Sequence, residues 1–325
     1  MRLKYSVFLG NVGHCFDRYC TEYSAPFLLE ELFDRVSSIK DIQAVDLVMN
    51  WDMMEKRKEI KKLLEQTDLE VGSLAVDTFA NPLYKKGSLS STDENVRMQA
   101  IRDSKAVIDF AAEIGCGIVT LWPGQDGYDY IFSAGYLRER QLFADGVEEL
   151  CRYNPEITIT LEYKIKEPRT HSYISTVGAT LLMIEKIGLP NLGIALDYGH
   201  AALGYETPAE AVAMCKMYGD RLKHIHINDN YRLWDDGMIV GTVHTLEFLE
   251  FFYWLKRTGY KGYLVIDQFP YREDGREAVA ESARWLNVLQ AAAAAIDDKE
   301  VEMVIAKRDG VAASRYMRKL LFKEA

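Results

Sequence analysis

Between residues 5 and 295 the chain alternates short apolar runs with longer amphipathic stretches, and this alternation recurs eight times. The apolar runs are Tyr5–Gly10, Ile42–Met49, Leu69–Val76, Gly117–Trp122, Ile157–Leu161, Asn191–Leu196, Leu222–Ile225 and Tyr263–Ile266. A continuous apolar run predicts a strand buried on both faces, and helices between such strands predict parallel crossovers. Eight units of about 30 to 40 residues predict an α/β fold that closes into a (β/α)8 barrel.

An open, doubly wound sheet is the alternative arrangement of the same units. Its dinucleotide-binding version is disfavoured because no G-x-G-x-x-G turn follows the first apolar run. With 325 residues, of which 48% are hydrophobic, the chain can bury one large core. We therefore predict a barrel domain over residues 1–295.

A short segment, residues 296–325, follows the last barrel unit. It mixes charged and apolar residues, and Gly310 is predicted to separate two helices. An amphipathic helix needs a surface on which to bury its apolar face. We predict a C-terminal helical extension that packs against a neighbouring subunit, in a homo-oligomer such as a dimer or a tetramer.

The net charge and the cysteine pattern limit the classes of binding partner and the cellular compartment that we expect for this chain. A formal charge of −10 and a pI of about 5.2 argue against a nucleic-acid or anionic-membrane surface. No 18 apolar residues run together, and the apolar stretch near the N-terminus is too short for a signal peptide. The five cysteines include no CxxC pair, which predicts reduced thiols in a cytoplasmic protein.

Four successive apolar runs of the second half each end in a potential metal ligand. These residues are Glu162, Asp197, His226 and Asp267. The C-terminal ends of barrel strands face one common mouth, so the four side chains are predicted to meet there. Three carboxylates and one imidazole suit Mn²⁺, Mg²⁺ or Co²⁺ better than a structural zinc site, which favours cysteine. The alternative is that each is an ordinary polar residue at a strand end.

Three further residues lie close to these ends in the sequence. His200 follows Asp197 by three positions, and Asp235 with Asp236 follows His226 across a short loop. Together they could bind a second ion or a metal-bound water, or the aspartates could belong to a solvated loop. His224 alternates with His226 on the same strand face, and we expect His224 to be a buried barrel histidine.

Lys164 and several aromatic residues complete the candidate site. Lys164 shares a strand face with Glu162 and could polarise a substrate oxygen, or form an ordinary salt bridge. Trp122, with Tyr128 and Tyr130, could line the mouth as a sugar platform, although aromatic residues there also serve as core filler. The loops of the first four strands, around Phe16, Trp51, Phe79 and Trp122, are expected to set substrate choice.

Four motifs together resemble a known family. They are LEYKIKEP at Leu161–Pro168, LDYGH at Leu196–His200, HINDN with WDDGMIVG at His226–Asn230 and Trp234–Gly241, and VIDQ at Val265–Gln268. The chain resembles the xylose-isomerase-like TIM barrels, a superfamily of sugar isomerases and epimerases, and most closely the L-rhamnose isomerases of the broad-specificity bacterial type. The resemblance covers roughly Tyr5 to Ala295, and its specific part is the second half.

The resemblance implies a metal-dependent aldose–ketose isomerase that converts L-rhamnose to L-rhamnulose or acts on a related 6-deoxy or rare sugar. The four strand-end residues would bind a structural ion, with Mn²⁺ preferred over Co²⁺ or Mg²⁺. A second ion in each subunit would use His200, Asp235 and Asp236. Lys164, Asp235 and His200 would be catalytic, and hydrogen would move between C1 and C2 by a hydride shift or through an enediol.

The chain departs from that family in two places. Gly237 stands where the family carries a third aspartate, which weakens the second metal site. The family's ring-opening histidine has no clear match, because His14 is a poor substitute. The substrate-binding residues would be Trp122, Lys164, Phe16 and Trp51.

Other activities of the superfamily remain open. A ketose 3-epimerase would use two metal-bound glutamates on opposite faces of the sugar, where this chain has Asp267 on the last strand. A polyol dehydratase is a further possibility, and a sugar-binding barrel without catalysis is a distant one. DNA-repair enzymes of the endonuclease IV type are disfavoured by the six histidines and the negative charge.

Overall fold

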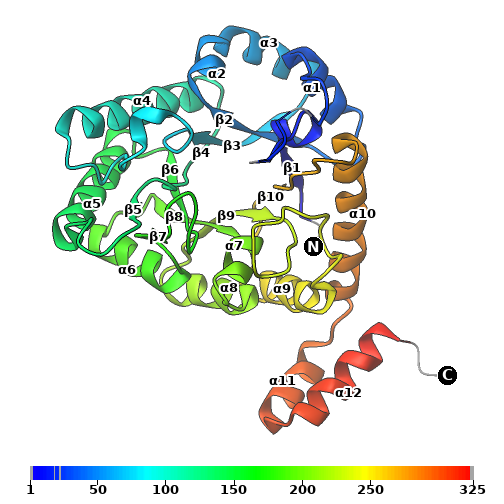
Figure 1. Cartoon of the computed structure of the whole chain (residues 1–325). Helices are drawn as coiled ribbons and strands as arrows, with labels where there is room; N and C mark the ends of the chain where they lie inside the picture. The colour runs from blue at the N-terminus through cyan, green and yellow to red at the C-terminus, as the bar shows by residue number, and fades with distance from the viewer. Residues whose placement is uncertain (1–2, 18, 22, 323–325) are drawn as a thin grey trace.

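The structure, a computed structural model, describes residues 3–17, 19–21 and 23–322. Eight parallel strands close into a barrel in the order β1-β10-β9-β8-β6-β4-β3-β2 (Figure 1). The strands are β1 Tyr5–Phe8, β2 Ala44–Met49, β3 Glu70–Val76, β4 Ile118–Leu121, β6 Thr158–Glu162, β8 Leu192–Asp197, β9 Leu222–Ile227 and β10 Leu264–Ile266. The predicted (β/α)8 barrel is therefore confirmed, and each strand overlaps its predicted apolar run.

Helices surround the barrel on its outer face (Figure 1). They are α1 Leu29–Ser37, α2 Trp51–Glu55, α3 Arg57–Thr67, α4 Glu94–Glu113, α5 Tyr136–Tyr153, α6 Val177–Ile187, α7 Tyr198–Leu203, α8 Pro208–Met217, α9 Thr245–Thr258 and α10 Gly275–Ala294. The unit after β2 contains two helices where the sequence predicts one, because Lys56 leaves the helical conformation. Short α7 and the small antiparallel sheet of β5 Gly127–Tyr128 and β7 His171–Ser172 were not predicted.

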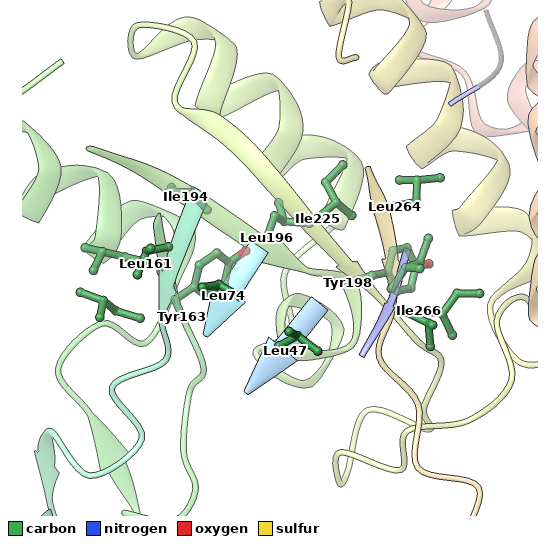
Figure 2. Close-up of a cluster of buried hydrophobic side chains, with 14 of the residues drawn as sticks. Leu47, Leu74, Leu161, Tyr163, Ile194, Leu196, Tyr198, Ile225, Leu264 and Ile266 are labelled. Carbon is green, nitrogen blue, oxygen red and sulfur yellow. The ribbon is translucent and has the colours of Figure 1, made fainter. Parts of the chain in front are cut away.

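The apolar core lies mainly between the strands and the helices. Leu196, Ile225 and Ile266 belong to one large buried cluster, part of which Figure 2 shows as sticks. Side chains alternate along a strand, so neighbours of these residues point into the barrel. On β9 the outward Ile225 and Ile227 therefore alternate with the inward His224 and His226.

A polar network fills the inside of the barrel. The imidazole of His224 lies 2.7 Å from Asp46 on β2, and because β9 and β2 are not neighbours in the barrel, this contact crosses the interior. Asp46 also accepts hydrogen bonds from Ser6 and Ser73. Buried carboxylates are stable only when such donors surround them. His224 is thus the buried barrel histidine that its alternation with His226 predicts.

Two helices, α11 Asp298–Lys307 and α12 Gly310–Leu321, follow the barrel and project away from it (Figure 1). Ion pairs from Lys256 and Arg257 on α9 to Asp298 tether the first of them. Gly310 begins the second helix, so it separates the two as predicted. Among the described residues, no helix is both long enough and apolar enough to span a membrane.

Candidate metal centre

Four side chains meet at the C-terminal ends of neighbouring barrel strands. Glu162 and Asp197 are the last residues of β6 and β8, His226 lies near the end of β9, and Asp267 follows β10 directly. One ligand atom from each lies within 4.8 Å of the others. The strands are adjacent in the barrel, so their parallel register brings the four side chains to one place.

The donor atoms of this group face one another around His226. The Nδ1 atom of His226 lies 3.2 Å from Glu162 Oε1 and 3.9 Å from Asp267 Oδ2. Both ring nitrogens of His226 are buried and have no hydrogen-bond partner in the described part of the chain. A buried nitrogen without a partner is costly unless another ligand completes it. Oxygen and imidazole donors in this arrangement fit a divalent cation such as Mn²⁺.

The pKa shifts of the three carboxyl groups also favour a bound cation. Burial raises the pKa of Asp267 to about 7 despite the nearby His226, since Asp197 and Glu162 add negative charge. Burial also raises the pKa of Asp197, and His200 only partly opposes it. Burial opposes the ionisation of Glu162 too, but His226, His200 and Lys164 outweigh it and lower its pKa. A bound divalent ion would supply the positive charge that three crowded carboxylates lack.

A second polar group lies beside these donors and consists of His200, Asp235 and Lys164. The Oδ2 atom of Asp235 accepts a hydrogen bond from Lys164 Nζ at 2.8 Å and lies 3.2 Å from His200 Nε2. The other ring nitrogen of His200 lies 3.3 Å from Glu162 Oε1, which joins the two groups. Lys164 also forms a 2.6 Å ion pair with Glu167.

The charges within this second group stabilise each other. Burial opposes the charge on Lys164, but Asp235 and Glu167 outweigh it and raise its pKa. Burial likewise opposes the charge on Asp235, and His200 with Lys164 lowers its pKa. Lys164 is therefore a buried ammonium held at the edge of the candidate metal centre.

Asp236 and Gly237 are the positions at which this loop could supply further ligands to a second metal ion. The Oδ2 atom of Asp236 accepts a hydrogen bond from the backbone nitrogen of Tyr231, so Asp236 closes a turn in its own loop. Gly237 has a φ of +56°, and a Cβ there would lie 2.8 Å from the backbone nitrogen of Phe269. A side chain at that position requires the loop to shift. An aspartate at position 237 does not fit this backbone.

The aromatic residues predicted to bind substrate lie in different places. Trp122 packs against Phe79 with ring centroids 4.5 Å apart, and its centroid lies 6.4 Å from that of His200. The Lys164 ammonium lies 5.2 Å from the Trp122 centroid, so this ring forms a wall of the mouth. Trp51 instead donates a hydrogen bond to Asp103 on α4.

Phe16 and the tyrosines of the fourth loop complete the predicted rim. Phe16 lies beside His14, at a centroid distance of 6.1 Å, and its side chain is largely exposed. His14 itself contacts Ser24 and the backbone of Thr21, so it fastens its own loop. Tyr128 stacks on His171 at 4.6 Å. The structure thus brings Trp122 to His200 and Lys164, and it places Phe16 among neighbours of its own loop.

Sequence reasoning missed three residues that support the centre. Asn228 donates hydrogen bonds to both carboxylate oxygens of Asp197, at 3.2 and 3.1 Å. Phe8 packs edge-on against His226 at 4.9 Å, and Asn11 donates to Asp267 at 3.4 Å. Asn228 follows His226 by two positions and so shares its strand face, a signal that could have identified it. Phe8 and Asn11 carry no comparable signal.

The chain was compared with known proteins. A family model described as "Xylose isomerase-like TIM barrel" matches residues 33–289. The xylose isomerase of Thermus thermophilus is 28% identical over 279 residues, which cover 80% of this chain and 71% of that protein.

Two solved structures share the fold over 89% of this chain. A D-tagatose 3-epimerase-like protein has a TM-score of 0.69 at 20% identity, over 99% of its own chain. A D-allulose 3-epimerase from Methylomonas sp., in complex with D-allulose, has a TM-score of 0.68 at 17% identity, over 97% of its chain. Because the family model covers most of the sequence, this chain belongs to the xylose isomerase-like TIM barrel family.

Proposed function

We propose that this protein is a divalent-metal-dependent isomerase of a free monosaccharide, and that its reaction is ketose 3-epimerisation. The observation that carries the proposal is the group of four donors, Glu162, Asp197, His226 and Asp267, within 4.8 Å of one another at the barrel mouth. A divalent ion bound there would act as a Lewis acid, polarising the sugar carbonyl and making the neighbouring C–H bond more acidic. Mn²⁺ is the ion we propose.

Epimerisation needs one group that removes a proton and another that returns it on the opposite face. Glu162 and Asp267 are the candidates for these two roles. Glu162 ends β6 and Asp267 follows β10, and these two strands are separated in the barrel by β8 and β9. Both carboxylates lie near Nδ1 of His226, at 3.2 and 3.9 Å. The choice of reaction is supported by two structures that share this fold, a D-tagatose 3-epimerase-like protein and a D-allulose 3-epimerase.

The group of His200, Asp235 and Lys164 supports the site from one side. Lys164 is buried and charged, so its ammonium could donate a hydrogen bond to a sugar oxygen as negative charge develops there. Asp235 holds both Lys164 and His200 through one oxygen. Because this oxygen already contacts two side chains, it does not serve as a ligand of a second ion. Position 237 has no room for a further carboxylate ligand. We accordingly propose one ion in each subunit, where the sequence predicts two.

Aldose–ketose isomerisation is the second candidate reaction. It is supported by the 28% identity with a xylose isomerase over most of the chain and by the position of Lys164 beside the candidate metal ligand Glu162. L-Rhamnose remains a predicted substrate within this second reaction, and a polyol dehydratase remains the third possibility. A cytoplasmic location also stays a prediction.

Deuterium exchange separates these reactions. The Mn²⁺-loaded protein is incubated in D₂O with a panel of ketohexoses and aldoses, including D-tagatose, D-allulose, D-xylose and L-rhamnose, and the products are examined by NMR and chromatography. We expect deuterium at C3 together with the C3 epimer of a ketose, because a proton removed by a carboxylate exchanges with solvent. The same protein after treatment with a chelator is the control.

Each other outcome of that experiment has a definite meaning. An aldose–ketose pair without change at C3 would replace the first reaction by the second. Loss of water from the substrate would indicate the dehydratase. If no sugar of the panel changes with Mn²⁺ present, or if turnover survives thorough chelation, the metal-dependent isomerase proposal is wrong.

We also propose that the helices α11 and α12 pack against a second copy of the chain. Large apolar side chains on them remain exposed, among them Met303, Ile305, Val311 and Phe322. Between Lys307 and Phe322 the chain has five basic residues and one acidic residue, whereas the whole chain carries −10. The apolar and basic segment 307–322 is thus complementary to the net negative charge of another copy.

Sedimentation of the purified chain tests this contact. We expect a dimer or a larger assembly, and we expect Ile305→Asp with Phe322→Asp to give monomers whose thermal unfolding still shows a folded barrel. An assembly that is unchanged by both substitutions, or a monomeric native chain, would contradict the proposal.

A further inference from the structure

The loop between β9 and α9, residues 228–244, carries the side chain that holds Lys164 and His200. That side chain is Asp235, which lies near the middle of the loop. Loops of this length are mobile unless internal contacts restrain them, and a side chain held within a fraction of an ångström needs such restraint. The question is which contacts of the loop fix Asp235.

One buried carboxylate joins the two ends of this loop. Asp229 Oδ2 accepts hydrogen bonds from the backbone nitrogens of Val243 at 2.8 Å and His244 at 3.1 Å. Its other oxygen, Oδ1, accepts from the backbone nitrogen of Asn230 at 3.0 Å and lies 2.7 Å from His244 Nδ1. The backbone of Asp229 also pairs with Met238 in both directions, at 3.1 and 2.8 Å, which closes the part of the loop that contains Asp235.

His244 connects this carboxylate to an arginine of the same loop. Arg232 Nε donates to His244 Nε2 at 3.0 Å. Because a guanidinium can only donate, His244 Nε2 is an acceptor, and the ring hydrogen therefore sits on Nδ1 and is donated to Asp229. Arg232 has a φ of 66°, in the left-handed region, and its backbone nitrogen donates to Asn230 Oδ1 at 2.8 Å. These contacts define the conformation of the loop between Asp229 and Asp235.

We propose that Asp229, His244 and Arg232 form a clamp that positions Asp235, and through it the ammonium of Lys164. The three are positioning residues, since Lys164 and not the clamp would touch the sugar. The loop is also fastened to α7, which carries His200, because Asn230 Nδ2 donates to the carbonyl of Gly199 at 2.9 Å. The clamp therefore fixes the place of Asp235 relative to both of its partners.

None of the hydrogen bonds of Asp229, His244 and Arg232 given above reaches the four metal donors. All the contacts of Asp229 described above lie within the loop and at the start of α9. Loosening the clamp should therefore change turnover without changing Mn²⁺ binding. A misplacement of about 1 Å in such a site costs about 10²-fold in rate. A merely structural role would instead lower turnover, metal affinity and thermal stability together.

The first variant is Asp229→Asn, which replaces one acceptor oxygen by a donor that faces backbone N–H groups. We expect kcat to fall about 10²-fold while the Kd for Mn²⁺ and the KM of the sugar stay unchanged. Glu247→Gln is the matched control, because it removes only the 3.5 Å surface contact with Arg232. Equal loss of Mn²⁺ affinity and of kcat in Asp229→Asn would overturn the proposal.

Two variants of His244 separate the contributions of its two hydrogen bonds to kcat. His244→Asn places an amide nitrogen where Nδ1 lies and so keeps the bond to Asp229, whereas His244→Ala loses both bonds. We expect the Asn variant to retain most of kcat and the Ala variant to behave like Asp229→Asn. If the two His244 variants lose equal activity, the bond to Asp229 has no positioning role.

The activity measurements rest on the proposed function. NMR and hydrogen exchange test the clamp without any substrate and are therefore independent of that function. Nitrogen-15 NMR of histidine-labelled protein should show the Nδ1-protonated tautomer for His244. Hydrogen exchange of the amides around Asp235 should also become faster in Asp229→Asn and stay unchanged in Glu247→Gln. An Nε2-protonated His244, or unchanged exchange, refutes the clamp even if the protein acts on no sugar of the panel.

Discussion

Replacing Glu162 by Gln is expected to abolish both Mn²⁺ binding and turnover. Glu162 lies 3.2 Å from His226 and 3.3 Å from His200, so it belongs to both polar groups of the site. Glutamine keeps the shape of the side chain and removes its charge. Because the bound ion would supply several kcal/mol of the catalytic effect, the loss of kcat should be about 10³-fold or more. Metal analysis of the purified variant, together with the exchange assay, measures both effects.

The matched control for this substitution is Glu156→Gln, at an exposed position ahead of the same strand. It should retain metal and activity. A Glu162→Gln protein that still binds one equivalent of Mn²⁺ with native affinity would show that the ion lies elsewhere.

Replacing Lys164 by Met should leave the ion in place and remove most of the activity. Its ammonium is buried and lies 2.8 Å from Asp235 and 2.6 Å from Glu167, beside Trp122 at the mouth. A group that donates to a developing charge contributes about 10²- to 10³-fold to kcat, and we expect a loss of that size. The same substitution leaves Asp235 without its ammonium partner, and breaking a buried pair costs up to about 3–5 kcal/mol of stability.

Lys166→Met is the control for the lysine, because its ammonium lies farther out, over the ring of Trp234. Steady-state kinetics, Mn²⁺ titration and chemical denaturation distinguish the outcomes. Full activity of Lys164→Met would show that this lysine only pairs with its neighbours. Loss of the ion would show that the lysine acts on the metal donors and not on the sugar.

The sequence predicts the barrel and the four strand-end donors because both follow from local patterns. A buried parallel strand requires a continuous apolar run, and its C-terminal residue must face the barrel mouth. Glu162 and Asp197 end their strands for this reason. The sequence also identifies Lys164, through its spacing from Glu162, but its ion pair with Asp235 joins segments far apart in the chain.

The remaining features depend on contacts that no local pattern encodes. Asp236 is bonded within its own loop, although its position beside Asp235 made it an equal candidate. The backbone of Phe269 approaches Gly237 closely, and the indole of Trp51, on α2, donates a hydrogen bond to Asp103 on α4. Tertiary packing decides each of these placements. Gly237 also changes the proposal from two ions to one.

The account depends most directly on where Mn²⁺ binds. Crystals of the protein grown with Mn²⁺ and measured at the manganese absorption edge locate the ion without any assumption about the substrate. The account predicts one anomalous peak per chain, surrounded by Glu162, Asp197, His226 and Asp267. It is contradicted if these four residues surround no peak, or if the ion lies instead with the inner pair of Asp46 and His224.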